Sequence, residues 1–331
     1  LAVPCLLLVA ETGGTNGAQA SAAAGLGLGP EPVRATQLGQ LVIGLGLAAG
    51  AFALSRLPAR GLVSAAGVTV GAALLWLHLP LVSFAGAALL AAGVVLAGAS
   101  LLGGPLHPSR SAAGVVLPLS IGWLLFVGTA FGYYAFWAYL PAVYAATAIV
   151  AVACAAAASG ARLGRPVALG VMALAVAVPL VAVLATPGPG AGEPLRRTFR
   201  FMTYNVHQGF DAGQIPSFDE LVQTISAESP DVVCLQEVVR GWMIDQQHDS
   251  LSILAERLGM QYAFIPNIGD LYGNAVLTRA PMSDARFVRY AREPSVKHQP
   301  RGALFVDIEG PDQRKLLVVV EKTKPGFSAW C

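Results

Sequence analysis

Charged residues are scarce in the first 186 positions of this 331-residue chain. That stretch holds two acidic and six basic residues, whereas the remaining positions hold 17 acidic and 15 basic ones. Over the whole chain 12% of residues are charged, 55% are hydrophobic, and the mean hydropathy is +0.62. Ordinary soluble domains carry about 25% charged residues. The shortage of charge therefore excludes a soluble domain for the first part and predicts that it lies in a lipid bilayer.

Cysteine is scarce as well. The four cysteines are Cys5, Cys154, Cys234 and Cys331, and no two of them stand at the short spacing typical of a zinc site or of a small disulfide framework. We therefore expect neither a zinc site nor a disulfide.

Uncharged apolar runs separate the few charges of the first part, and crossing the hydrocarbon core takes roughly 20 helical residues. We predict spans at 37–55, 62–80, 82–102, 112–132, 137–158 and 166–186. The first ten residues, LAVPCLLLVA, lack the basic start of a signal peptide and are typical of the end of one more helix. Frequent Gly and Ala indicate closely packed helices, hence a multi-pass α-helical membrane bundle.

The arginines of the first part predict its orientation. They lie mainly in the loops 56–61, 103–111 and 159–165, whereas the connections between those loops carry none. Loops rich in Lys and Arg stay in the cytoplasm. We therefore expect an integral protein of the plasma membrane whose chain leaves the last helix on the extracytoplasmic side.

A Pro- and Gly-rich segment, TPGPGAGEP at 186–194, cannot continue a helix and marks a domain boundary. We divide the chain into a bundle of about six full spans plus a partial first at 1–186, a linker at 187–197, and an α/β domain at 198–331.

Strand and helix patterns alternate after the linker. TFRFMTYNV is rich in strand formers, PSFDELVQTISAESP is amphipathic with Ser217 and Glu220 at capping-box spacing, and DVVCLQEV is a buried-strand pattern. Such a β-α-β unit places its strands parallel, so Asn205 and Glu237 at the strand ends share one edge of a sheet. A second helix, DSLSILAERLG, and the strands GNAVLTR, ARFVRY, RGALFVDIE and KLLVVVE follow.

Open α/β sheets bind ligands at the carboxyl ends of their strands. Glu237, after an apolar run, must be solvated, paired or bound to a metal, and a carboxylate in a phosphate site suits Mg²⁺. Asn274 and Arg301 are further candidates for contact with phosphate oxygens, with plain surface positions as the alternative. His207 either faces the site or belongs to a turn.

Four motifs, MTYNVHQG, PDVVCLQEV, YGNAVLTR and PRGALFVDI, resemble the endonuclease/exonuclease/phosphatase superfamily with its DNase I-like two-sheet sandwich, over about residues 198–320. The resemblance implies that Asn205 positions metal and phosphate and that Glu237 is a metal ligand, with Mg²⁺ or alternatively Mn²⁺ as cofactor. A bundle followed by such a domain also resembles the membrane proteins that remodel the lipid of glycosylphosphatidylinositol (GPI) anchors.

The match ends early. After KLLVVV the family has a Thr-His pair with a catalytic His, then an Asp-x-Asn and an Asp-His, whereas this chain reads EKTKPGFSAWC. We therefore expect a truncated domain that lacks most of its second sheet, leaves apolar strand faces uncovered and is inactive as printed.

The predicted function is that of a membrane-anchored, Mg²⁺-dependent phosphodiesterase-type hydrolase acting on a lipid or GPI-like phosphodiester. The C-terminal part has two more acidic than basic residues, so it offers no basic surface for nucleic acid. A membrane-tethered nuclease is therefore the weaker alternative, and a non-catalytic lipid-handling or scaffolding membrane protein is the other.

Overall fold

The computed structural model describes residues 34–56, 61–77, 79–102, 111–113, 116–117, 119–124, 126–127, 164–186, 192–241, 248–268, 271–290 and 300–321. The chain forms two compact units. Leu1–Ala20 and Gln37–Val183 belong to the first, and Ser21–Thr36 and Leu184–Cys331 belong to the second.

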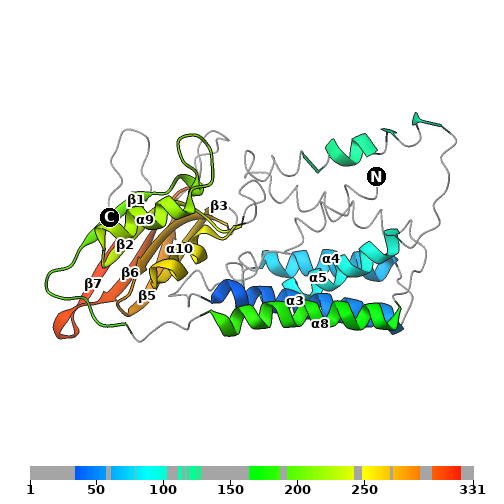
Figure 1. The fold of residues 1–331 in the computed structure, drawn as a ribbon, viewed down its shortest axis with the longest axis horizontal. Helices are drawn as coiled ribbons and strands as arrows, with labels where there is room; N and C mark the ends of the chain where they lie inside the picture. The colour runs from blue at the N-terminus through cyan, green and yellow to red at the C-terminus, as the bar shows by residue number, and fades with distance from the viewer. Residues whose placement is uncertain are drawn as a thin grey trace. The chain divides into compact units, whose positions relative to one another are not determined.

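The described part of the first unit is helical (Figure 1). Its main helices are α3 (Ala35–Arg56), α4 (Gly61–Trp76), α5 (Pro80–Leu102) and α8 (Arg165–Ala185). Three of them, α3, α5 and α8, are long and apolar enough to cross a membrane, and α4 is a shorter apolar helix. The predicted spans at 37–55, 82–102 and 166–186 thus coincide with candidate membrane helices. The span predicted at 137–158 lies outside the described residues, as does much of 112–132.

The helix α4 ends at Trp76, four residues short of the predicted end of its span. Pro80 explains the difference. A proline disfavours helical geometry in the residue before it, yet at the first position of a helix its missing N–H is no loss. Pro80 therefore begins α5 instead of closing α4.

Glycines bring the helices of the first unit close together. A Cβ added to Gly46 of α3 would lie 2.1 Å from the carbonyl oxygen of Ala88 in α5, and one on Gly44 would lie 2.0 Å from that of Ala175 in α8. Pro179 has no N–H to donate to the Ala175 carbonyl four residues earlier, and it is this carbonyl that Gly44 approaches. Small residues therefore serve close helix packing here, as predicted.

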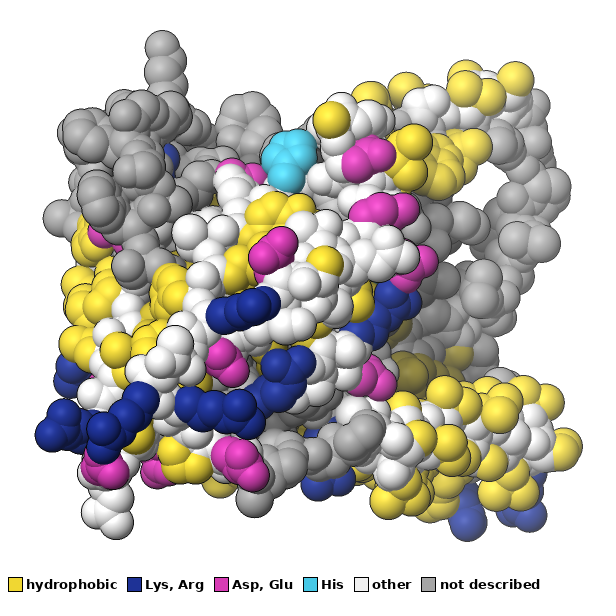
Figure 2. Space-filling model, turned by 60° about the vertical axis from the view of Figure 1, so that its left-hand side comes forward, with side chains coloured by type: hydrophobic (Ala, Val, Ile, Leu, Met, Phe, Trp, Pro, Cys, Tyr) yellow, Lys and Arg dark blue, Asp and Glu magenta, His cyan; other side chains and the backbone are white. Residues whose placement is uncertain are grey.

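Large apolar side chains remain exposed on these helices, and Figure 2 shows many hydrophobic side chains on their surface. Leu62 is 75% exposed, Leu184 is 74% exposed and Leu174 is 67% exposed. Contiguous apolar surface of this kind marks a membrane or a protein interface.

Residues 192–321 of the second unit, as far as the structure describes them, form two sheets and two α-helices. In chain order its elements are β1 (Phe201–Asn205), η3 (His207–Gly209), α9 (Phe218–Glu228), β2 (Val232–Val239), α10 (Ser250–Leu258), β3 (Gln261–Ile268), β4 (Tyr272–Thr278), β5 (Met282–Arg289), β6 (Gly302–Glu309), η5 (Pro311–Gln313) and β7 (Lys315–Glu321). The first sheet has the order β1-β2-β4-β3 and the second β5-β6-β7. β1 and β2 are parallel, as predicted, and the other pairs are antiparallel.

The first sheet is covered on both faces. The helices α9 and α10 pack on one face through Leu221, Ile225 and Leu254, and the second sheet packs on the other face through Leu304 and Val306. The expectation of uncovered strands is wrong for the inward faces, because β5, β6 and β7 form a sheet that covers them. The strand pattern DVVCL, for example, has four consecutive residues, 232–235, with 0% exposure.

The segment before β1 also belongs to this core. Leu195, which the sequence analysis places in the linker, is 6% exposed and packs between the sheets. Its backbone N–H donates to the carbonyl of Glu309 at the end of β6, at 2.8 Å.

Three local features differ from the predictions. Ser217 precedes α9 at its N-cap, but its side chain makes no capping hydrogen bond. The strand β3 is absent from the sequence prediction, because a proline such as Pro266 argues against a strand. The structure accommodates this proline because β3 is an edge strand of the first sheet. Cys234 is disulfide-bonded, so the expectation of no disulfide is wrong. The spacing of the cysteines could not predict this disulfide, because Cys234 is distant in sequence from every other cysteine.

Candidate functional site

A β-bulge in β2 sets the position of Glu237. The pairing with β4 shifts between Leu235 and Val238, so that two residues, Gln236 and Glu237, stand opposite Asn274. Glu237 has φ of 58°, a left-handed conformation that few non-glycine residues adopt. Bulges re-aim side chains and are frequent beside active sites. Glu237 therefore lies two residues before the end of β2, and not at the end as predicted.

Strand alternation places the candidate side chains on one face of the first sheet. Met202 and Tyr204 pack beneath the helices, so Asn205 takes the opposite face. Val276 lies in the core between the sheets, so Asn274, two residues earlier in β4, shares that face.

The bulge puts its own residues on the same face. Leu235 and Val238 both lie beneath the helices. The two residues between them, Gln236 and Glu237, therefore both take the side of the second sheet. Asn205, Glu237 and Asn274 thus follow one another across β1, β2 and β4.

Asn205 is held from both sides. Its Nδ2 donates to Oε1 of Glu237 at 3.0 Å, and its Oδ1 accepts from the backbone N–H of His207, also at 3.0 Å. His207 has φ of 46° and begins the short helix η3. It is therefore a turn residue, one of the two roles expected, and it orients the Asn205 amide through its backbone.

Asn274 is the most unusual polar group of this region. It is 1% exposed, and neither its Nδ2 nor its Oδ1 has a hydrogen-bond partner within the described part of the chain. A buried polar group without a partner costs about 1–3 kcal/mol. Such a group in a native fold needs an explanation, and a role in binding a ligand is one.

Sequence reasoning missed two further amides. Gln236 is 2% exposed, and its Nε2 donates to Oγ1 of Thr203 at 3.1 Å, which ties β2 to β1 beside Asn205. Asn267 of β3 has a buried Oδ1 without a partner among the described residues. In both cases the available signal was an amide that interrupts an apolar strand pattern.

Arg301 stands in the facing sheet, just before β6. Its carbonyl accepts from the N–H of Tyr290 at 3.0 Å. A Cβ added to the next residue, Gly302, would lie 3.0 Å from Cδ1 of Ile265 and 3.4 Å from Oδ1 of Asn267. Since Ile265 pairs with Asn274, Arg301 and the start of β6 lie at the same end of the sandwich as the other candidates.

The donor set fits a hard cation that keeps most of its water. Glu237 is half-buried and Asn205 is exposed, so the carboxylate and the amide that donates to it lie together within reach of solvent. No group of three or more His, Cys, Asp or Glu suited to a metal occurs among the described residues. Mg²⁺ commonly uses only one or two carboxylates plus waters and substrate oxygens. The residues present therefore fit a hard divalent cation of this kind.

A buried ion pair fixes the chain beyond the bulge. Arg240 is fully buried, its Nη2 lies 3.3 Å from Oδ2 of Asp249, and it donates to Oη of Tyr262 at 3.0 Å. Its guanidinium also lies 5.3 Å from the ring centres of Tyr262 and Phe264. Asp249 in turn caps α10 by accepting from the N–H of Ser252. The residue after β2 is thereby tied to α10 and β3.

Comparison with known proteins supports the resemblance drawn from the motifs. A model of the Endonuclease/Exonuclease/phosphatase family matches residues 202–319, the stretch that contains Asn205, Glu237, Asn274 and Arg301. The chain is also similar to an endonuclease/exonuclease/phosphatase from Beutenbergia cavernae DSM 12333, with 25% identity and a TM-score of 0.32. That similarity covers 39% of each chain, so this chain spans well under half of the other protein. No curated protein matches.

Proposed function

We propose that the second unit is a metal-dependent hydrolase domain for phosphoric esters, with its metal and phosphate site at Asn205, Glu237 and Asn274. The family match to residues 202–319 supports the reaction class. The contact between Asn205 and Glu237 carries the assignment of the site, because it joins an amide and a carboxylate from adjacent parallel strands at an accessible sheet edge.

Each residue has a distinct part in this proposal. Glu237 holds Mg²⁺ through its carboxylate, and Asn205 fixes the orientation of that carboxylate through the hydrogen bond from Nδ2. Mg²⁺, when bound, polarises a phosphoryl oxygen and orients the attacking water. Mn²⁺ is the alternative ion, since it accepts the same oxygen ligands.

Asn274 and Arg301 complete the proposal as phosphate-binding residues. Nδ2 of Asn274 is a buried donor without a partner among the described residues, and a phosphate oxygen is an acceptor of the right kind. Arg301, half-buried just before β6, suits a bidentate contact with two other phosphate oxygens.

The substrate in this proposal is a membrane lipid with a phosphodiester, such as the lipid part of a GPI-like anchor. Two observations favour a lipid over nucleic acid. The part of the chain after residue 186 has 15 basic and 17 acidic residues, and it follows helices long and apolar enough to cross a membrane. In this proposal the domain lies on the extracytoplasmic side of the plasma membrane, which the arginine pattern of the loops favours.

The test measures binding, because the proposal concerns the residues that hold the metal and the phosphate. The full chain in detergent is titrated with Mn²⁺, and free ion is counted by electron paramagnetic resonance. We expect one site, with inorganic phosphate altering the spectrum of the bound ion. Phosphate without any effect on a bound ion would contradict the phosphate site while leaving the metal assignment in place.

A further inference from the structure

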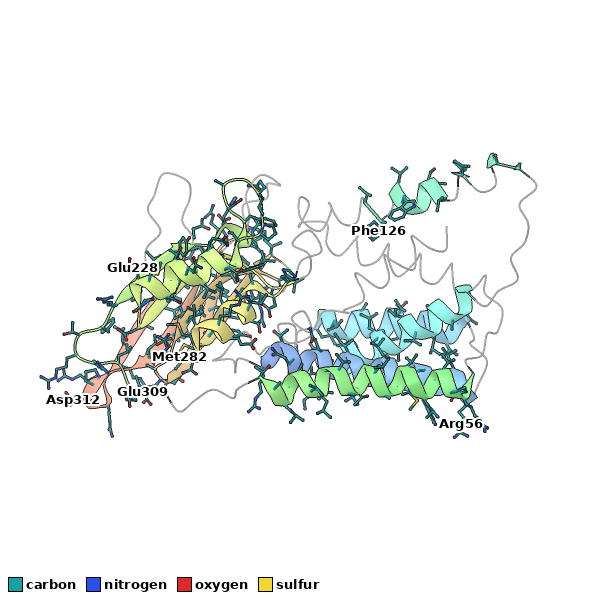
Figure 3. The ribbon with its side chains drawn as sticks, in the orientation of Figure 1. Arg56, Phe126, Glu228, Met282, Glu309 and Asp312 are labelled. Carbon is teal, nitrogen blue, oxygen red and sulfur yellow. The ribbon has the colours of Figure 1, made fainter. Side chains whose placement is uncertain are left out.

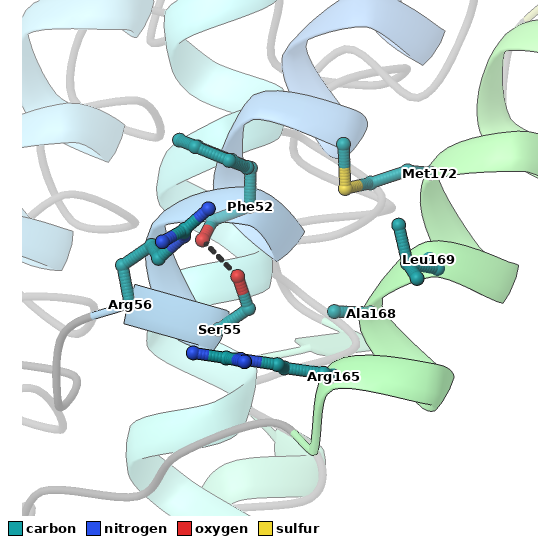
Figure 4. A pocket seen from close by; sticks show the side chains of 7 residues that line it. All are labelled: Phe52, Ser55, Arg56, Arg165, Ala168, Leu169 and Met172. Carbon is teal, nitrogen blue, oxygen red and sulfur yellow. Dashed lines mark hydrogen bonds between the residues drawn. The ribbon is translucent and has the colours of Figure 1, made fainter.

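A small cavity of about 210 Å³ lies between one end of α3 and the start of α8 in the first unit (Figure 4). The helix α3 contributes Phe52, Ser55 and Arg56 to its lining, and Arg56 is the last residue of that helix (Figure 3). The helix α8 begins at Arg165, which also lines the cavity.

Among the described residues, the lining of the cavity contains two arginines and no acidic side chain. Neither Arg56 nor Arg165 forms an ion pair with a residue that the structure describes. Figure 4 shows the side chain of Arg165 reaching from α8 toward Ser55. The Arg56 guanidinium lies 5.4 Å from the ring centre of Phe52, and Oγ of Ser55 donates to the Phe52 carbonyl at 2.7 Å. Two arginines in one small cavity repel each other unless an anion lies between them.

The rest of the lining is apolar. Ala168, Leu169 and Met172 of α8 continue the wall from Arg165 toward the middle of that helix. The exposed fraction is 64% for Leu169 and 49% for Phe52. A free inorganic anion gains nothing from such a wall, whereas an acyl chain attached to the anion does.

Both helices meet the length and hydropathy of a membrane span, so their charged ends mark the level of the lipid headgroups. Basic pockets between transmembrane helices at this level bind the headgroups of anionic lipids. We propose that Arg56 and Arg165 bind the phosphate of an anionic phospholipid, with its acyl chain along Leu169 and Met172. The site is separate from that of the hydrolase, and it rests only on the membrane anchoring within the proposed function.

The test compares lipid retention by the full chain. Membranes are first extracted with alkaline carbonate, because release of the parent protein would disprove the anchoring itself and this site with it. The purified chain is then examined by native mass spectrometry after exchange into phosphatidylglycerol or phosphatidylcholine. We expect the parent to retain phosphatidylglycerol in preference to phosphatidylcholine.

The decisive variant is Arg56→Gln/Arg165→Gln. Each basic side chain near a membrane surface contributes about fivefold to the binding of an anionic lipid, so retention should fall roughly thirtyfold. Arg34→Gln, which removes the same charge just before the other end of α3, is the control and should bind as the parent does. If the double variant does not fold, each single variant is compared with the control and should lose about fivefold.

Two further results would overturn the proposal. One is equal retention of phosphatidylglycerol by the parent and the arginine variants. The other is displacement of the lipid by inorganic phosphate at millimolar concentration, which would make the ligand a free anion. Stabilisation against heat by added phosphatidylglycerol, present in the parent and absent in folded Arg56→Gln, would support the site independently.

Discussion

The side-chain amide of Asn205 donates a 3.0 Å hydrogen bond to the carboxylate of Glu237, although the two residues lie 32 positions apart. The parallel pairing of β1 with β2 brings them together, and the bulge turns Glu237 to the face that Asn205 occupies. The amide thus fixes the orientation of the Glu237 carboxylate.

Replacing Asn205 by Ala should weaken metal binding without abolishing it. The substitution removes the hydrogen bond that orients Glu237 but keeps the charge, and loss of such a supporting group typically costs about 10–100-fold in metal affinity. Mn²⁺ titration followed by electron paramagnetic resonance measures the change. Unaltered affinity in Asn205→Ala would show that the contact does not support a metal ligand.

Replacing Asn274 by Leu should separate stability from ligand binding. Leu has the same branched shape without the buried amide, so the second unit should gain on the order of 1 kcal/mol in local stability. Hydrogen–deuterium exchange of the β2 and β4 amides in the full chain measures this gain. Inorganic phosphate should at the same time lose its effect on bound Mn²⁺. If the variant is destabilised and its bound Mn²⁺ still responds to phosphate, Asn274 is a structural core residue and does not bind phosphate.

The buried pair of Arg240 and Asp249 should dominate the stability around α10. Arg240→Met leaves Asp249 buried without its partner, which typically costs about 3–5 kcal/mol. Faster hydrogen–deuterium exchange in α10 and β3 is the expected result. The control is Arg257→Met, which breaks an exposed ion pair with Asp219 and should cost less than about 1 kcal/mol. Equal effects of the two variants on exchange would show that the buried pair contributes no more to stability than the exposed one.

The close approach of α3 and α5 predicts strong sensitivity at Gly46. A side chain there meets the backbone of Ala88, so Gly46→Leu should lower the melting temperature of the chain in detergent. Gly170 of α8 is the matched control, because an added Cβ at that position meets nothing within 4 Å. If Gly170→Leu is as harmful as Gly46→Leu, the helices do not pack through this glycine.

Motifs and periodicity predicted the elements that carry the site. Asn205 and Glu237 were found because an apolar run that ends in a polar residue is conspicuous, and because a β-α-β crossover fixes parallel pairing. The bulge at Glu237 escaped prediction, since it exists only through the register of β2 against β4. Asn267 and the disulfide of Cys234 escaped for a related reason: tertiary contacts made by residues distant in sequence decide their roles.

The central claim is that Glu237 is the anionic ligand of a divalent metal. Glu237→Gln keeps the size and shape of the side chain and removes only its charge, so it is the most direct test. Titration of the full chain with Mn²⁺, read by electron paramagnetic resonance, should show one site in the parent and a loss of affinity larger in Glu237→Gln than in Asn205→Ala. Equal Mn²⁺ affinity of Glu237→Gln and the parent would contradict the account.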